Sequence, residues 1–260
     1  MTSKEPSKIN WVYQKWPKRT VATLVWLKEL GVSDKLANWH VRSGWLEKFG
    51  AGAFIQPGDH VNWQGGLYAL QSQLSLSIHV GGRSALELQG LSHYVPLGEH
   101  KKVILISDKP EQLPAWFRNK KWDDAIECRR MSLFKSIPVE AVTESDCGGF
   151  SVAVSSAERA IMEQMYLASL NDDIDQVHQL MEGLTTLRPG VVHELLENCR
   201  SVKVKRLFLW SAETAGHGWF SRLDTHKIDM GKGKRQIYQG GQLNQRYQIT
   251  VPKQGDLPGV

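Results

Sequence analysis

Two short helical segments joined by a tight glycine turn constrain the fold of this chain more than any other feature. Leucines recur at helical spacing across residues 24–30, and Gly31 then suits a helix end because glycine readily adopts a left-handed conformation. Thr23 and Ser33 are suited to cap the two helices, and we expect the second helix to end near Ser43. The short connection between them predicts a helix-turn-helix.

The second helix gathers side chains of the kind that read DNA. At 100° per residue, Lys35, Asn38 and Arg42 fall on one arc. Arginine can bond the O6 and N7 atoms of guanine, and asparagine can bond the N6 and N7 atoms of adenine. The pattern favours a helix that enters the major groove. The opposite arc, which we expect to face the core, carries Leu36, Ala37, Trp39 and His40.

A glycine-rich hairpin follows this helix directly. Residues 45–49 are strand-like, residues 50–52 (Gly-Ala-Gly) form a turn, and residues 53–55 return as a second strand. A hairpin in this position is a wing, so residues 1–60 are predicted to form a winged helix that binds DNA. The alternative is a small helix–hairpin domain that binds protein. The predicted DNA contacts are Lys18, Arg19, Ser33, Lys35, Asn38, Arg42 and Lys48.

Charge is distributed unevenly along the chain. Residues 1–60 carry nine Lys/Arg against five Asp/Glu, residues 61–199 carry twelve against eighteen, and residues 200–240 carry nine against three. Basic ends around an acidic middle suggest that a polyanion meets the ends. We predict a second nucleic-acid-binding surface, with RNA among its ligands, at Lys203, Lys205, Arg206, Lys232, Lys234 and Arg235.

Aromatic residues interleave with this second basic zone, and they leave two interpretations open. Basic groups beside aromatic rings can hold phosphates and stack bases. Alternatively, Trp210 and Trp219 are core residues and the lysines form a solvated rim.

Residues 61–260 are expected to form a larger mixed domain of the α/β or α+β class, whose topology the pattern does not reveal. Asn62 caps a linking helix over residues 62–74, and Gly81-Gly82 precedes a short helix for which close packing is favoured over anion binding. Ser155 and Glu158 are spaced as a capping box. Strands are expected at residues 103–107, 124–131, 150–154, 236–239 and 243–251, and further helices at residues 113–118, 191–199 and 202–215.

Motifs for catalysis or metal binding are missing from the sequence. The three cysteines are scattered, and there is no H-E-x-x-H, G-x-S-x-G or G-x-x-x-x-G-K-[ST] pattern. The acidic run at residues 171–175 is explained more simply by helix capping than by a metal. We therefore expect no metal, no cofactor and no enzyme activity. A nucleic-acid-processing enzyme delivered by a winged helix is the alternative.

The N-terminus lacks an apolar segment of signal-peptide type, and no apolar run reaches the roughly 18 residues that a membrane span requires. We therefore expect a cytoplasmic protein that does not enter a membrane.

Several stretches in a fixed order resemble the AbiEi family, the antitoxins of type IV toxin–antitoxin systems. They are Trp26–Glu29, Ser43–Glu47, Leu67–Gln71, Gly81–Gly90, Ser155–Ala160, Val202–Phe208 and Gly231–Arg235. The resemblance implies a winged helix that represses its own operon by binding upstream operator DNA. It also implies a C-terminal domain that counters a nucleotidyltransferase-like toxin without a stable complex, a direct protein-binding antitoxin being the alternative. On this resemblance the second basic surface would be either a nucleic-acid-binding or an antitoxic surface. The family's wing often carries a basic residue between glycines, whereas this chain has Ala51, which leaves Lys48 as the nearest cation.

Overall fold

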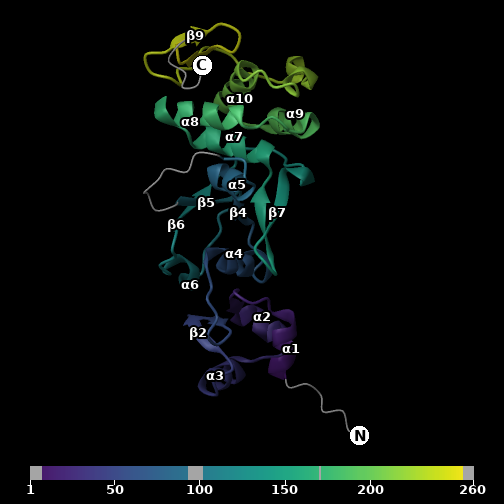
Figure 1. Cartoon of the computed structure of the whole chain (residues 1–260), viewed down its shortest axis with the longest axis vertical. Helices are drawn as coiled ribbons and strands as arrows, with labels where there is room; N and C mark the ends of the chain where they lie inside the picture. Colours follow the sequence, from purple (N-terminus) through teal and green to yellow (C-terminus); the bar gives the residue numbers. More distant parts are fainter. Residues whose placement is uncertain (1–7, 93–101, 170, 254–260) are drawn as a thin grey trace. The chain divides into compact units, whose positions relative to one another are not determined.

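The computed structural model describes residues 8–92, 102–169 and 171–253 (Figure 1). The chain divides into two compact units, each built from separate stretches of sequence. Unit 1 comprises Met1–His79, His100–Cys128 and Glu144–Ala153, and unit 2 comprises Val80–Glu99, Arg129–Thr143 and Val154–Val260. The whole is a mixture of helices and sheets, as the sequence predicts.

The N-terminal part of unit 1 is a winged helix. Its sheet has the antiparallel order β1-β3-β2, in which β2 and β3 form the wing. Both predicted caps are confirmed, since the Thr23 hydroxyl accepts from the Trp26 amide and the Ser33 hydroxyl accepts from the Leu36 amide. In chain order the elements are α1 (Lys8–Lys15), β1 (Ala22–Thr23), α2 (Leu24–Glu29), α3 (Asp34–Arg42), β2 (Glu47–Gly50) and β3 (Ala53–Ile55).

The buried face of α3 differs from the predicted one at two residues. Ala37 and His40 are buried as expected, but 55% of Trp39 is exposed. The core contacts the helix through an arc that also takes in Val41. At 100° per residue Trp39 lies roughly 130° from the middle of that arc, so its placement in the core is wrong.

Other elements of unit 1 pack around the winged helix. Helix α4 (Trp63–Ser72) is capped by Asn62 as predicted, because the Asn62 Oδ1 atom accepts from the Gly65 amide. At its far end, the Gln73 side chain bonds both the Thr23 amide, at 2.7 Å, and the Val21 carbonyl, at 2.8 Å. The predicted helix at residues 113–118 is shorter, α6 (Ala115–Arg118).

A five-stranded sheet has the order β6-β5-β4-β8-β7. Strands β4 and β8 are parallel, with Val80 opposite Val154. Strands β5, β6 and β8 were predicted from the sequence. Strands β4 and β7 were not, because β4 is very short and β7 has a largely exposed run of residues without apolar alternation. The strands are β4 (Ile78–Val80), β5 (Lys102–Ser107), β6 (Ala125–Arg130), β7 (Val142–Asp146) and β8 (Ser151–Ser155).

Unit 2 is mainly helical, with a small antiparallel hairpin of β9 (Gln242–Asn244) and β10 (Ile249–Val251). The predicted strand at residues 236–239 is not formed. That region is held by an isolated bridge between Arg235 and Ile249 and by the Ile237 and Tyr238 amides, which donate to the Thr250 Oγ1 atom. The helices are α5 (Gly82–Leu88), α7 (Ala157–Leu167), α8 (Asn171–Glu182), α9 (Pro189–Asn198) and α10 (Val202–Thr214), with short 3₁₀ turns at Val139–Ala141, Phe220–Arg222 and Thr225–Lys227.

The predicted capping box at the start of α7 is wrong. The N-cap is Ser156, and the Ser155 hydroxyl instead donates to the Glu163 Oε2 atom at 2.8 Å. The same carboxylate accepts from the Gly82 amide at 3.1 Å, while the Gln164 Oε1 atom accepts from the Arg83 amide at 3.0 Å. The start of α5 is thus closed by side chains of α7, which agrees with close packing at Gly81-Gly82.

Candidate nucleic-acid interface

The exposed face of α3 carries the predicted base-reading residues. Lys35, Asn38 and Arg42 are all exposed. Neither cation has a hydrogen-bond or ion-pair partner for its side chain within the described ranges of the chain. The Asn38 Nδ2 atom donates to the Asp34 carbonyl at 2.9 Å, so Asn38 must release this bond to read an adenine. Two free cations and one amide therefore point away from the core.

Trp39 also belongs to this exposed face, although helical periodicity placed it on the opposite arc. Its ring lies edge-on to the ring of His40, with 5.0 Å between centroids. His40 is buried, and burial lowers the pKa of its imidazole, which keeps this neighbour neutral. The signal that would have found Trp39 is its angular distance from Ala37 and Val41 on the helical wheel.

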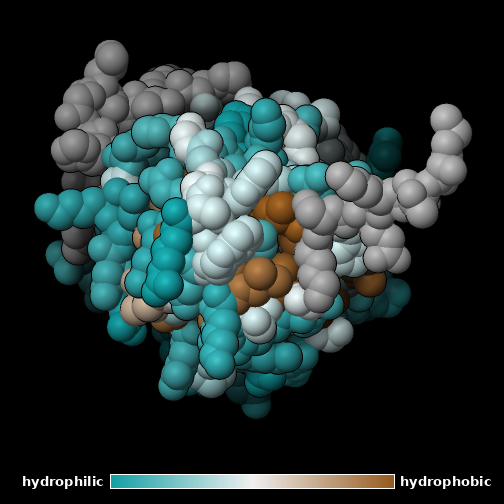
Figure 2. Space-filling view, turned by 90° about the horizontal axis from the view of Figure 1, so that it is seen from below, coloured by the Kyte–Doolittle hydropathy of each residue, from teal (hydrophilic) through white to brown (hydrophobic). Residues whose placement is uncertain are grey.

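Apolar side chains recur on the surface of the winged helix. Figure 2, seen from the end at which α1 and α3 are drawn in Figure 1, shows some hydrophobic side chains exposed among pale and hydrophilic ones. The exposed large apolar residues of this domain are Trp11, Val25, Trp39 and Trp45. Such exposure favours a surface that meets another molecule.

The wing is attached to another part of unit 1. The Phe49 ring lies 6.2 Å from that of Trp116 and 6.0 Å from that of Trp122. A Cβ atom added at Gly50 would lie only 2.6 Å from the Cβ atom of Trp116, so glycine is needed for this approach. Lys48 and Ala51, by contrast, are exposed.

Three of the predicted DNA contacts lie away from the exposed face of α3 or are already engaged. The Arg19 guanidinium donates from Nη2 to the carbonyls of Cys147, at 2.8 Å, and Gly148, at 2.6 Å, which ties the turn between β7 and β8 to the winged helix. The hydroxyl of Ser33 is occupied as the cap of α3. Lys18 is exposed but lies in the turn after α1. We therefore remove Arg19 from the set of DNA-contacting residues.

The half of the second predicted basic surface that lies on α10 is turned inward. Lys205 is buried and its Nζ atom donates to the Asp229 carbonyl at 2.9 Å. The Lys203 Nζ atom donates to the carbonyls of Tyr166 and Ala168, and burial lowers the pKa of this amine. These two lysines stabilise the fold, which corrects their assignment to a binding surface.

Arg206 is the centre of this inward arrangement and is only 2% exposed. Helix α10 is buried on every side from Val204 to Ala212, so a charge there has no route to solvent. Because the helix carries lysines beside Arg206, its sequence suggested an exposed face and did not predict this burial. The guanidinium donates to the carbonyls of Met230, Gly231, Gly233 and Gln248 at distances of 2.6–3.1 Å.

The tryptophans of this zone are core residues. Trp219 is buried, stacks on His217 and donates from Nε1 to the Leu184 carbonyl at 2.9 Å. Trp210 is buried and stacks on His178. Neither ring is available to stack a base, which confirms the alternative interpretation for the aromatics. Lys232, Lys234 and Arg235 remain exposed on the loop that Arg206 orders.

Two family models match this chain, one over each part. The model described as "Transcriptional regulator, AbiEi antitoxin N-terminal domain" matches residues 5–97. The model described as "Transcriptional regulator, AbiEi antitoxin, Type IV TA system" matches residues 100–252. The chain belongs to the AbiEi antitoxin family of transcriptional regulators. The resemblance drawn from the sequence motifs is thereby confirmed.

A solved structure has a fold similar to that of this AbiEi-family chain. The crystal structure of the RV2827C protein from Mycobacterium tuberculosis matches with a TM-score of 0.56 and 12% sequence identity, covering 95% of this chain and 92% of that one. At this identity the likeness concerns the fold alone. A search of curated proteins finds no match.

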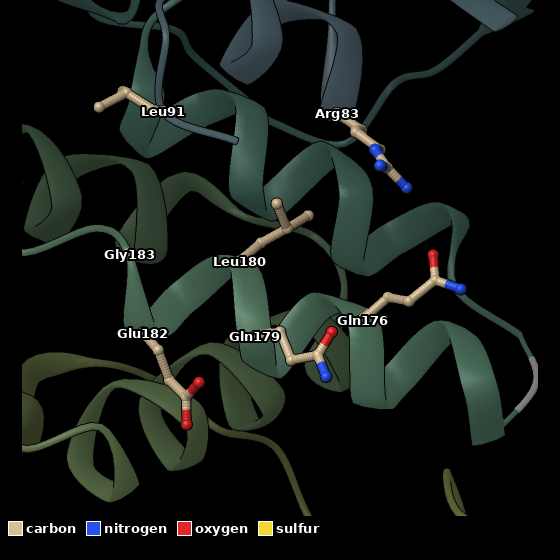
Figure 3. Close-up of a pocket in the computed structure, with 7 residues that line it drawn as sticks. All are labelled: Arg83, Leu91, Gln176, Gln179, Leu180, Glu182 and Gly183. Atoms are coloured by element: carbon tan, nitrogen blue, oxygen red, sulfur yellow. The ribbon is translucent and has the colours of Figure 1, made fainter. Parts of the chain in front are cut away.

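Unit 2 of this AbiEi-family chain also contains a mainly apolar groove of about 310 Å³ between α5 and α8 (Figure 3). In the close-up, Arg83 extends toward the side of α8 that carries Gln176, while Glu182 points away. The Arg83 Nε atom is bonded to the Glu87 Oε1 atom at 2.9 Å. The groove gathers no set of groups that would act on a bound molecule.

The described ranges of the chain contain no group of three His, Cys, Asp or Glu side chains that could hold a metal ion. None of the helices there combines the length and apolarity needed to cross a membrane.

Proposed function

We propose that this AbiEi-family regulator represses its own operon by placing α3 in the major groove of operator DNA. The observation that carries this proposal is the exposed face of α3, where the Lys35 and Arg42 side chains have no partner in the described protein. Unpaired cations on a helix that follows a tight corner suit contact with phosphates and guanine edges. We assign operator binding to residues 1–60.

Trp39 supports the same docking. A large apolar ring beside Asn38 and Arg42 gives the helix a means of contacting thymine methyl groups, which are exposed only in the major groove. We expect Lys48 to contact a phosphate from the wing. Lys18 is a further candidate for a phosphate contact.

For the antitoxic activity we propose residues 61–260, acting against a nucleotidyltransferase-like toxin without forming a stable complex. The family assignment supports an antitoxin of a type IV system and a regulatory, non-catalytic role. The antitoxic surface is narrowed to the exposed cations Lys232, Lys234 and Arg235, which present charge suited to RNA or another polyanion. Because the proposed operator lies on DNA, we place the protein in the cytoplasm.

The test is binding of the full chain to the DNA upstream of its own gene, measured by fluorescence anisotropy against an unrelated duplex of equal length. Arg42→Ala and Asn38→Ala are each expected to reduce discrimination by about 1–3 kcal/mol, or roughly 5- to 150-fold. Arg222→Ala is the matched control, since Arg222 is also exposed and lies in unit 2. If both α3 variants bind the upstream DNA as selectively as the control does, α3 is not the reading helix.

The antitoxic part needs its own test. Co-expression with the toxin should rescue growth, and a purified mixture of the two proteins should separate on size exclusion. A stable stoichiometric complex would instead support an antitoxin that acts by binding the toxin directly.

A further inference from the structure

The segment that contacts the wing brings three cations to it from a distant part of the sequence. Phe117 and Trp122 pack against helix α4, where a Cβ atom added at Gly66 would meet Trp122 at 2.8 Å and Phe117 at 3.0 Å. The same segment contacts the wing through Trp116 and Trp122. Because two sides are held in this way, residues 115–122 have a fixed position beside β2 within unit 1 (Figure 1).

The cations of this segment are Arg118, Lys120 and Lys121, and all three are exposed. The Lys120 Nζ atom lies 4.5 Å above the centre of the Phe49 ring, which places a positive charge at the edge of the wing. None of the three forms an ion pair with an acidic side chain in the described ranges. The segment thus supplies the wing with charge that its own tip, Ala51, lacks.

The same residues line a groove of about 570 Å³. Arg118, Lys120 and Lys121 are cations of this groove, and Phe117 and Trp122 contribute aromatic surface. Asp124 also lines it, but its Oδ2 atom already accepts from the Trp63 Nε1 atom at 2.8 Å. Asp123 next to it is exposed. A concave surface with unpaired cations beside a wing is suited to a phosphate backbone.

We propose that Arg118, Lys120 and Lys121 form a phosphate-binding surface that extends the winged-helix interface along duplex DNA beyond the wing. The inference rests on the proposed function, since it assumes that the wing approaches DNA. These contacts carry no sequence information, so they add affinity equally to operator and to other duplexes.

The experiment measures the salt dependence of duplex binding by the full chain and by a triple variant, Arg118→Gln, Lys120→Gln and Lys121→Gln. The slope of log K against log salt is negative, and each lost phosphate contact reduces its magnitude by about 0.9. The slope of the triple variant is therefore expected to be smaller in magnitude by up to about 3. The ratio of operator to non-operator affinity should not change. A duplex shortened on the wing side should weaken binding by the unmodified protein more than binding by the triple variant.

A control triple removes the same charge elsewhere. Lys135, Arg222 and Lys253 are exposed residues of unit 2, and replacing all three by glutamine should leave the slope unchanged. A charge-preserving triple (Arg118→Lys, Lys120→Arg, Lys121→Arg) should retain the slope. Thermal melting of all variants identifies any that have lost the fold, and the charge-preserving triple then shows whether charge or packing is responsible.

The outcomes separate this inference from the proposed function. A slope equal to that of the control triple overturns the inference, even if Asn38→Ala and Arg42→Ala reduce discrimination. A lowered slope together with intact discrimination in those two variants supports the phosphate surface and refutes the reading helix. If the triple variant binds single-stranded DNA or RNA more weakly than the unmodified protein does, but binds duplex DNA equally well, the inference is also overturned. The groove would then hold a single strand.

Discussion

The basic residues of α3 and those of α10 have opposite environments. On α3, Lys35 and Arg42 are exposed and unpaired within the described residues. On α10, Lys205 and Arg206 are buried and donate to backbone carbonyls. Both helices present a similar density of Lys and Arg in the sequence, so charge density alone does not identify a binding surface.

The difference comes from what surrounds each helix. Helix α3 has one apolar arc and leaves the remaining faces to solvent, whereas α10 is buried all round from Val204 to Ala212. A cation on a fully surrounded helix must find acceptors inside the protein, because an unpaired buried charge is very costly. Carbonyls of an irregular loop are suitable acceptors, since no sheet or helix uses them.

The largest effect that could break this comparison is expected at Arg206. Arg206→Met leaves the loop carbonyls of Met230, Gly231 and Gly233 without their donor, and we expect a loss of about 3–5 kcal/mol of unfolding free energy. Arg206→Lys should recover only part, because a single ammonium cannot replace the fork of the guanidinium. Urea unfolding followed by tryptophan fluorescence provides the measurement.

The matched control for Arg206 is Arg235→Met on the exposed loop, for which a change of under about 0.5 kcal/mol is expected. Equal stabilities of the two methionine variants would show that Arg206 is not a structural cation. The contrast between the basic residues of α3 and those of α10 would then be lost.

A second, slightly smaller effect is expected at Glu158, which Arg188 engages through three hydrogen bonds of 2.8–2.9 Å. Burial alone raises the pKa of this carboxyl, but the bonds from Arg188 outweigh it and lower the pKa from 4.5 to about 2. A depressed carboxyl pKa stabilises the fold fully above the unfolded value near 4.5. That contribution, about 3 kcal/mol, is lost as the pH falls toward 2.

The measurement compares the unfolding free energies of the unmodified protein and Glu158→Gln from pH 7 down to pH 2.5. The difference should be constant above about pH 5 and should shrink below it. If the difference in unfolding free energy does not change with pH, Arg188 does not stabilise the charged form of Glu158. Arg188 would then be a solvated cation like Lys35 and Arg42 of α3.

The smallest predicted effect concerns the contribution of Trp39, on the exposed face of α3, to DNA binding. If Trp39 contacts a thymine methyl group, replacing thymine by uracil throughout the bound DNA should weaken binding by about 1 kcal/mol per methyl contact. Trp39→Ala should bind more weakly but should no longer distinguish the two DNAs. Trp45→Ala is the control, because Trp45 is also exposed but lies beyond the end of α3. A Trp39→Ala protein that still prefers thymine would rule out this contact.

Local patterns in the sequence were sufficient for the winged helix. The caps Thr23 and Ser33, the turn at Gly31 and the hairpin after α3 are all decided within a few residues, and the structure has each of them. The exposed positions Lys35, Asn38 and Arg42 followed from helical periodicity. Trp39 was misplaced because periodicity gives the width of a buried arc more reliably than its centre.

What only the tertiary structure decided are relations between distant residues. Arg19 bonds a turn near residue 147, Arg206 bonds a loop near residue 231, and Lys120 lies on the ring of Phe49. No periodicity encodes such pairs, because hydrogen-bond acceptors and aromatic faces come from segments whose approach depends on the packing of the whole chain. The sequence alone therefore determined which residues are cations and where α2, α3 and α4 begin, whereas folding decided which of those charges remain available to a partner.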